Sequence, residues 1–314
     1  MKINVGVLGS GNMARAHIKV FKNIKEFEIV GVVGRGKKNI TKTKKEFSKL
    51  IFFKSLKELF NNVKIDLLVI CINEDVIIKK YKEVLKYKCI FLFEKPLGIN
   101  YLETKKILNY CNVMKKNVFV SLNRRFYSST LLALKLFKKI KVNEPKTIFI
   151  NDSQDIPRII KLGLSKRLSE NLMYTNSIHL IDYINIFIKE KIVSVENILK
   201  FKKNKPKDVL SYIEFSSNSR VIYKANWSEN ERWLINIFSK RLNLYFKPLE
   251  KLQIYFPKNI KLKKNYDFFD KKYKPGLYNQ ATEILKFFQN KEHDLVGIKD
   301  YFKSVKIVKK IYNI

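Results

Sequence analysis

A glycine-rich turn near the start of the chain restricts its possible folds more than any other feature of the sequence. Residues 2–8 alternate and then become apolar, as a β-strand does, and residues 13–21 follow with a helical pattern. Between them the chain reads G-x-G-x-x-A. The first glycine permits a tight turn, the second lets backbone approach a pyrophosphate, and the small last residue allows close helix–strand packing. The motif therefore predicts a dinucleotide-binding βαβ unit, whose expected cofactor contacts are Gly9, Ser10, Gly11, Asn12, Met13 and Ala14.

Strand and helix patterns continue to alternate up to about residue 122. The segments with strand character are 27–33, 51–54, 66–72, 89–93 and 118–122, and those with helical character are 42–50, 56–61, 74–86 and 101–115. Strands that alternate with helices form a parallel sheet in βαβ units. We therefore expect residues 1–122 to form an NAD(P)-binding Rossmann domain with a doubly wound parallel sheet.

The second half of the chain has a different pattern. A strand at 146–151 and a helix between 170 and 189 precede six strand-like runs separated by short turns, at 192–201, 209–216, 220–227, 233–238, 242–246 and 252–256. Helical patterns stand at 131–139, 278–289 and 299–312. Tandem strands with short turns predict an open, mostly antiparallel sheet. We therefore expect an α/β protein whose residues 123–314 form a second α/β domain.

The predicted strand at 89–93 stops at Glu94-Lys95-Pro96. In an open parallel sheet, ligands bind outside the carboxyl ends of the strands, so Lys95 is expected where a substrate and a redox cofactor meet. A lysine at an apolar strand end can also have its pKa lowered by burial and serve in proton transfer. Lys95 is therefore a candidate catalytic residue, although an ordinary solvated lysine is the alternative.

The end of the second strand bears on the choice of cofactor. A site that prefers NAD carries Asp or Glu here, to accept from the 2′-hydroxyl of the adenosine ribose. This chain has Gly34 and then Arg35. The missing carboxylate removes repulsion against a 2′-phosphate, and Arg35 can pair with that phosphate or stack on adenine. The sequence therefore favours NADP over NAD, with a simple loop cation as the alternative for Arg35.

The formal net charge of +36 invites a nucleic-acid interpretation. Only nine of the 64 basic residues are arginine, the residue that readers of grooves and phosphates favour. Lysine is spread over every predicted helix instead of gathering with exposed aromatic residues for base stacking. We therefore expect the partner to be a small molecule and not a nucleic acid.

Neither a membrane segment nor a metal site is apparent in the sequence. No apolar run approaches the ~18 residues that span a bilayer, and no signal peptide is recognisable. Cys71, Cys89 and Cys111 lie in apolar segments without metal-ligand spacing, as reduced core residues do. These features predict a cytoplasmic protein with no metal centre and no membrane contact.

Together the motifs resemble the glucose-fructose oxidoreductase/inositol dehydrogenase family (Gfo/Idh/MocA). The resemblance rests on the G-x-G-x-x-A turn, on Glu94-Lys95-Pro96, on Asn123-Arg124-Arg125-Phe126 and on His179-Leu180-Ile181-Asp182. It implies NAD(P)-dependent oxidation or reduction of a sugar, sugar phosphate, nucleotide sugar or cyclitol by a homo-oligomer, a dimer or a tetramer. It also implies that residues 123–314 serve substrate binding and oligomerisation. It also implies a cis peptide bond between Lys95 and Pro96, which would aim Lys95 at a cleft between the two domains.

The resemblance assigns catalysis to Lys95 and His179, with His179 as proton acceptor and Lys95 as the cation that stabilises the alkoxide. Glu94 is expected at the cofactor, and Arg124, Tyr174 and Asn176 are candidate substrate contacts, whereas His17 and Asp182 are interpreted as structural. One departure from the family stands out: an aspartate is often found four residues before the histidine, and this chain has Thr175 there.

Two functions from different classes therefore remain. The first is an oxidoreductase that uses NADP or NAD. The second is an NAD(P)-binding sensor or regulatory protein of the same fold with reduced catalysis, which Thr175 suggests and the retained Lys95 and His179 oppose.

Overall fold

The structure of the protein is a computed structural model, which describes residues 2–140, 144–161, 163, 165–202, 208–227, 231, 233–256, 259–261 and 267–314. The chain divides into two compact units. The first unit is Met1–Asn123 with Phe269–Phe302, and the second unit is Arg124–Phe268 with Lys303–Ile314. Within the described residues, no helix has the length and apolar character needed to cross a bilayer.

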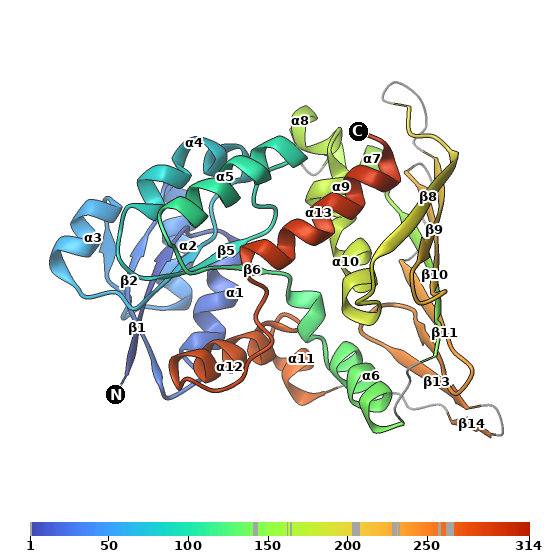
Figure 1. The fold of residues 1–314 in the computed structure, drawn as a ribbon. Helices are drawn as coiled ribbons and strands as arrows, with labels where there is room; N and C mark the ends of the chain where they lie inside the picture. Colours follow the sequence, from blue (N-terminus) through green and yellow to red (C-terminus); the bar gives the residue numbers. More distant parts are fainter. Residues whose placement is uncertain are drawn as a thin grey trace. The chain divides into compact units, whose positions relative to one another are not determined.

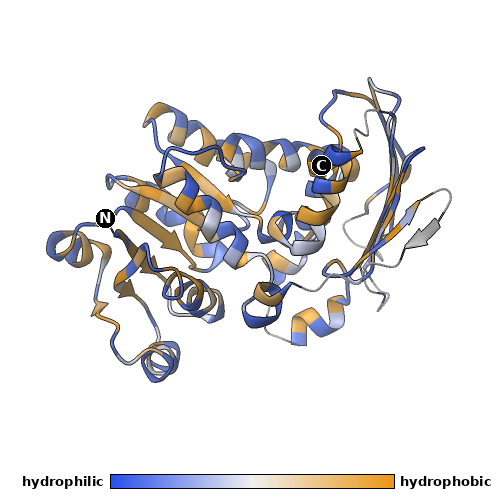
Figure 2. Ribbon diagram, turned by 90° about the horizontal axis from the view of Figure 1, so that it is seen from below, coloured by the Kyte–Doolittle hydropathy of each residue, from blue (hydrophilic) through white to orange (hydrophobic). Residues whose placement is uncertain are grey.

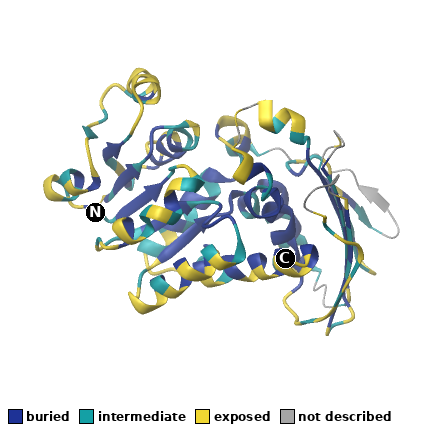
Figure 3. Cartoon of the chain, turned by 90° about the horizontal axis from the view of Figure 1, so that it is seen from above, coloured by how far each residue is buried: buried dark blue, intermediate teal, exposed yellow. Residues whose placement is uncertain are grey.

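The first unit is built on a six-stranded parallel sheet, as predicted. Its strands are β1 (Ile3–Leu8), β2 (Phe27–Val33), β3 (Phe52–Phe53), β4 (Leu67–Ile70), β5 (Ile90–Glu94) and β6 (Val118–Ser121). They are ordered β3-β2-β1-β4-β5-β6, and every neighbouring pair is parallel. The order reverses between β1 and β4, which makes this the switch point where such sheets bind ligands. All residues of β4 and β6 are buried, as expected for strands with helices on both faces (Figure 3).

The helices of this unit cover both faces of the sheet. They are α1 (Asn12–Phe21), α2 (Lys37–Glu46), α3 (Leu56–Asn62), α4 (Glu74–Leu85), α5 (Tyr101–Val113) and α12 (Leu277–Phe288). Figure 1 shows α4 and α5 on one face and α1 and α12 on the other. The helix predicted at 42–50 begins five residues earlier, because α2 is almost wholly polar with only Thr43 buried, and apolar periodicity cannot mark its start.

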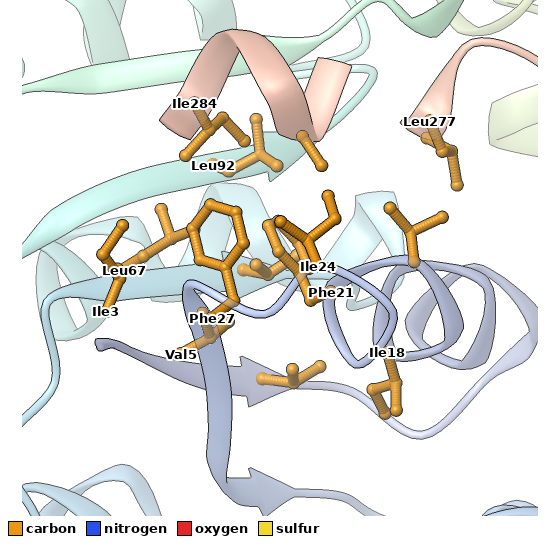
Figure 4. Close-up of a cluster of buried hydrophobic side chains, with 14 of the residues drawn as sticks. Ile3, Val5, Ile18, Phe21, Ile24, Phe27, Leu67, Leu92, Leu277 and Ile284 are labelled. Atoms are coloured by element: carbon orange, nitrogen blue, oxygen red, sulfur yellow. The ribbon is translucent and has the colours of Figure 1, made fainter. Parts of the chain in front are cut away.

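Part of the C-terminal region belongs to the first unit, whereas the sequence-based division assigned everything after residue 122 to a second domain. Side chains of α12 enter the hydrophobic core formed by β1, α1, β2, β4 and β5. Figure 4 shows Leu277 and Ile284 of α12 in one cluster with Ile18 and Phe21 of α1. Each Å² of apolar surface that is buried contributes about 25 cal/mol to the free energy of unfolding, so this packing stabilises the unit. The first unit is therefore discontinuous in the sequence.

The second unit contains the predicted open sheet, with eight strands. They are β7 (Thr147–Ser153), β8 (Ile192–Leu199), β9 (Val209–Phe215), β10 (Arg220–Asn226), β11 (Leu234–Phe238), β12 (Asn243–Phe246), β13 (Leu252–Phe256) and β14 (Asn259–Lys261). Their order is β14-β13-β12-β11-β7-β10-β9-β8, and only the β7–β10 pair is parallel among these strands. Strands such as β9 alternate between buried and half-buried residues, the pattern of a sheet covered on one face (Figure 2).

In the described part of the unit, the helices lie on one side of this sheet (Figure 1). They are α6 (Ser128–Lys139), α7 (Ile156–Lys161), α8 (Lys166–Ser169), α9 (Leu172–Thr175) and α10 (Ile178–Phe187). The single helix predicted between 170 and 189 is thus two helices, interrupted at Asn176-Ser177. The 3₁₀ helix Asn123–Phe126 leads into this unit, and α11 (Phe268–Lys272) and α13 (Ile298–Tyr312) complete the chain. The expected self-association stays a prediction.

Candidate cofactor site and catalytic residues

A cavity of about 410 Å³ opens at the carboxyl ends of β1, β2 and β4, entirely within the first unit. Four predicted cofactor residues line it: Gly9, Ser10, Gly11 and Arg35. The remaining lining residues are Leu8, Val33, Asn39, Lys54, Ser55, Leu56, Cys71, Ile72, Asn73, Val76, Lys80, Glu83 and Val84. The cavity thus lies at the topological switch point, where a doubly wound sheet is expected to bind a dinucleotide.

The two glycines of the turn have different physical roles. Gly9 has φ +129°, and a Cβ there would lie 2.4 Å from the carbonyl oxygen of Cys71. Only glycine therefore fits at position 9. A Cβ on Gly11 would meet no described atom within 4 Å, so the backbone there faces open space. This is the room that a pyrophosphate needs next to the first turn of α1, whose N-terminal amides attract anions.

Side chains from α1 and α2 hold the turn in place. The carbonyl oxygen of Ser10 accepts hydrogen bonds from the Thr43 hydroxyl and from Nη1 of Arg15, both at 3.1 Å. Arg15 also donates to the Asn12 side chain and pairs with Glu46 at 3.4 Å. Two donors hold this carbonyl, so the loop is restrained and an anion that binds there has less backbone to order.

The cavity lining is rich in cations. Arg35 follows β2, Lys54 follows β3, and Lys80 lies on α4. The carboxylate of Glu83 also lines the cavity, and it lies 2.5 Å from Nζ of Lys80. The Lys80 hydrogen bond, with the charges of Lys80, Lys86 and Arg35, lowers the pKa of the Glu83 carboxyl. Lys54 and Lys80 were not predicted from the sequence, although the position of Lys54 directly after a strand could have indicated it.

Glu94 and Lys95 stand at the end of β5, next to this cavity in the strand order. The Lys95–Pro96 peptide bond is cis, as the family resemblance implied. Oε1 of Glu94 lies 2.7 Å from Nε2 of His17, a buried residue of α1. Burial, with a smaller effect of the Glu94 charge, raises the pKa of the Cys71 thiol well above its usual range. Cys71 is therefore a neutral wall of the cavity and not a nucleophile.

His179 lies near the start of α10 in the second unit and is 5% exposed. Its backbone N–H donates to the carbonyl of Asn176 at 3.2 Å. The Asn176 amide in turn donates to Gln154 at 2.8 Å, and Gln154 donates to Asp152 at 2.6 Å. Thr175, which stands where the family often has aspartate, donates its hydroxyl to the Leu168 carbonyl at 3.5 Å. The loop before His179 is thus tied to the end of β7 through Asn176.

The other candidate residues of the second unit have distinct surroundings. The guanidinium of Arg124 stacks on the Trp233 ring at 4.2 Å, and Tyr174 is buried. Asp182 accepts from Nη2 of Arg125 at 2.6 Å and from the Ser304 hydroxyl at 2.6 Å, which agrees with its structural interpretation. Substrate contacts by Arg124, Tyr174 and Asn176 stay predictions. Among the described residues, no group of three or more His, Cys, Asp or Glu side chains could hold a metal ion.

Asp152 gives the second unit a pH-dependent stability. Burial raises the pKa of its carboxyl, while hydrogen bonds from Ser177, Tyr223 and Gln154 lower it less. A raised pKa means that the folded state binds the proton more tightly than the unfolded state, so this contribution to stability falls as pH rises through the folded pKa. We expect Asp152→Asn to remove that slope.

The measurement is urea unfolding of wild type and Asp152→Asn at a series of pH values from about 4 to 8. As pH rises, the unfolding free energy of the wild type should fall relative to that of the variant. A cost of the amide that does not depend on pH would shift this difference by a constant and leave its change with pH intact. Tyr223→Phe is the matched variant: it removes a donor to the ionised carboxylate, at 2.6 Å, and should extend the slope to higher pH. A difference that is constant with pH would contradict this account of Asp152.

Comparison with known proteins gives a family match for the N-terminal residues and structural matches for the whole chain. Residues 3–122 match the GFO_IDH_MocA family model, an oxidoreductase family with an NAD-binding Rossmann fold. The whole chain resembles the structure of a dehydrogenase from Chromobacterium violaceum (TM-score 0.83, 13% identity, 100% of this chain and 95% of that chain). It also resembles the dehydrogenase MviM from Clostridium difficile (0.81, 19%, 100% and 99%). A third similar structure is the UDP-N-acetylglucosamine 3-dehydrogenase GnnA from Acidithiobacillus ferrooxidans (0.78, 12%, 100% and 97%). At these identities the likeness shows the fold, and no curated protein sequence matches the chain.

Proposed function

We propose that the protein oxidises or reduces a CH–OH group of a carbohydrate-like molecule, as a member of the Gfo/Idh/MocA oxidoreductases, whose NAD-binding Rossmann fold residues 3–122 match. The candidate substrates are sugars, sugar phosphates, nucleotide sugars and cyclitols. The observation that carries the proposal is the cavity at the switch point, where Gly11 leaves open space beside the start of α1. The existence of a UDP-sugar dehydrogenase with this fold supports the substrate class.

The residues Lys95 and His179 have complementary roles in this proposal. A nicotinamide cofactor, when bound, supplies or accepts the hydride. His179 takes the proton of the substrate hydroxyl on an imidazole nitrogen, which a histidine can do near neutral pH. The Lys95 ammonium donates a hydrogen bond to the substrate oxygen as negative charge develops there, and so lowers the energy of the transition state.

The experiment that tests the function has two steps. Calorimetric titration with NADH and NADPH tests the cofactor site, and reduction of the oxidised cofactor is then followed with a panel of inositols, sugar phosphates and UDP-sugars. Saturable binding and turnover of one panel class support the proposal. Tight binding without turnover favours the sensor or regulatory protein that Thr175 suggests. If neither cofactor binds, the proposal is wrong.

We propose further that the cofactor is NADP. Arg35 and Lys54 are the residues that would hold a 2′-phosphate, because they supply positive charge beyond β2 and β3 and no carboxylate follows β2 at Gly34. We expect Arg35→Ala and Lys54→Ala each to weaken NADPH binding about tenfold, the effect of losing roughly 1.4 kcal/mol, and to change NADH binding much less.

Lys57→Ala is the matched control, since Lys57 is an exposed lysine of α3 outside the cavity lining. Its NADPH affinity should equal that of the wild type. Tighter binding of NADH than of NADPH by the wild type, or unchanged NADPH affinity in Arg35→Ala, would show that the preference is wrong.

A further inference from the structure

A buried hydrogen bond joins the helix that follows the glycine turn to the strand end that carries Lys95. His17 lies on the second turn of α1 and is 2% exposed. Its Nε2 lies 2.7 Å from Oε1 of Glu94, the last residue of β5, whose side chain is 13% exposed. The ring of His17 also stacks on Phe21, with centroids 6.2 Å apart. Both residues belong to the first unit, and 77 positions in the sequence separate them.

Only one of the two carboxylate oxygens of Glu94 is engaged in this way. Among the described residues, no hydrogen bond to Oε2 is formed, and this oxygen is not sealed in the interior. Glu94 is also near enough to Cys71, a residue of the cavity wall, for its charge to act on that thiol. The carboxylate therefore has one oxygen fixed from the side of α1 and a second oxygen available beside the cavity.

The strand order tells which part of a dinucleotide would reach Glu94. The cations Arg35 and Lys54 stand beyond β2 and β3, on one side of the glycine turn. A dinucleotide crosses the switch point with its pyrophosphate at that turn. Its adenosine half then lies toward β2 and β3, and its other half lies toward β4 and β5. Glu94 ends β5, so the ribose that bears the nicotinamide is the part with hydroxyl groups on this side.

We propose that His17 is a positioning residue for the cofactor: it holds the Glu94 carboxylate so that Oε2 accepts a hydrogen bond from a hydroxyl of the nicotinamide-side ribose. A glutamate carboxylate on three freely rotating bonds loses rotamer entropy on binding, whereas one that a buried donor already fixes loses little. The inference rests on the proposed function, since it takes the cavity to be a cofactor site.

Calorimetry with two ligands tests this role. The first ligand is whichever of NADH and NADPH the wild type binds more tightly, and the second is ADP, which has the adenosine and pyrophosphate but no second ribose. We expect His17→Leu to weaken binding of the reduced cofactor about tenfold, the scale of one hydrogen bond to a charged group, and to leave ADP binding unchanged. His17→Gln, which keeps a donor at similar reach, should restore most of the affinity.

A double-mutant cycle shows whether His17 acts through Glu94. Glu94→Ala should weaken the reduced cofactor at least as much as His17→Leu, and the double variant should be no worse than Glu94→Ala alone. His293→Leu is the matched control, because His293 is a half-buried histidine of the same unit that packs on Phe119 and Phe287. Its cofactor affinity should be unchanged.

Three results would overturn the inference. The first is an additive double variant, the second is an equal loss of ADP and cofactor affinity, and the third is a His17→Gln variant as weak as His17→Leu. If His17→Leu does not fold, which thermal unfolding shows directly, His17→Asn is measured instead, because its shorter amide cannot reach Glu94. Failure of the wild type to bind any of these ligands would be a different result, since it would refute the proposed function itself.

Discussion

Replacing Gly11 with valine should reduce cofactor affinity by at least about 100-fold while the protein remains folded. Gly11 has φ −78°, which any residue can adopt, and a Cβ there meets only open space. A side chain would then occupy the volume where the pyrophosphate must approach the backbone. Calorimetric titration with NADH and NADPH measures the loss, and circular dichroism with thermal unfolding establishes that the fold is retained.

Gly9→Val separates this effect from damage to the fold. At position 9 the backbone has φ +129°, and the new Cβ would lie 2.4 Å from the Cys71 carbonyl oxygen, so the variant should lose stability together with affinity. A folded Gly11→Val variant with wild-type affinity would mean that the cofactor does not bind at this turn.

The second large effect should appear in turnover. We expect Lys95→Ala and His179→Ala each to lower kcat by roughly two orders of magnitude or more, which is the usual contribution of general acid–base catalysis. Cofactor affinity should stay near that of the wild type, because both side chains act on the substrate in the proposed reaction. The double variant should be little worse than either single variant if the two residues stabilise one transition state as a unit.

The controls are one residue of each type in the first unit. Lys105→Ala removes an exposed lysine of α5, and His293→Ala removes a histidine that packs on aromatic rings. Both should keep wild-type turnover. Full activity in Lys95→Ala and in His179→Ala would falsify the catalytic assignment, and rate losses that multiply in the double variant would show that the two residues act independently.

Regular elements with a strong local pattern could be predicted from the sequence alone. Strand β2 was expected at 27–33 and is found there, because its apolar run is bounded by turn residues on both sides. The start of α2 could not be predicted, since that helix buries only Thr43. The membership of α12 in the first unit was missed for another reason: its apolar face is evident in the sequence, but its partner, α1, is more than 250 residues away.

The same limit applies to the candidate site. The glycine turn and Arg35 were identified because each occupies a fixed offset within a βαβ unit. Lys54 and Glu83 reach the cavity from separate elements, and no spacing rule connects them to the turn. His17 and Glu94 were both noticed individually, His17 only as a packing residue. Their hydrogen bond brings a side chain of α1 to the end of β5, and this proximity is a property of the folded unit and not of either segment alone.

The discontinuity of the first unit affects the order in which the protein can mature on the ribosome. Domains generally fold from the N-terminus as synthesis proceeds. Here the strands and α1 emerge first, but the apolar side chains Ile18 and Phe21 lack the α12 part of their core cluster until Leu277–Phe288 has been made. The whole of residues 124–268 is synthesised in that interval. The nucleotide-binding half is therefore started first and finished almost last, so that competence to bind the cofactor would coincide with near-completion of the polypeptide.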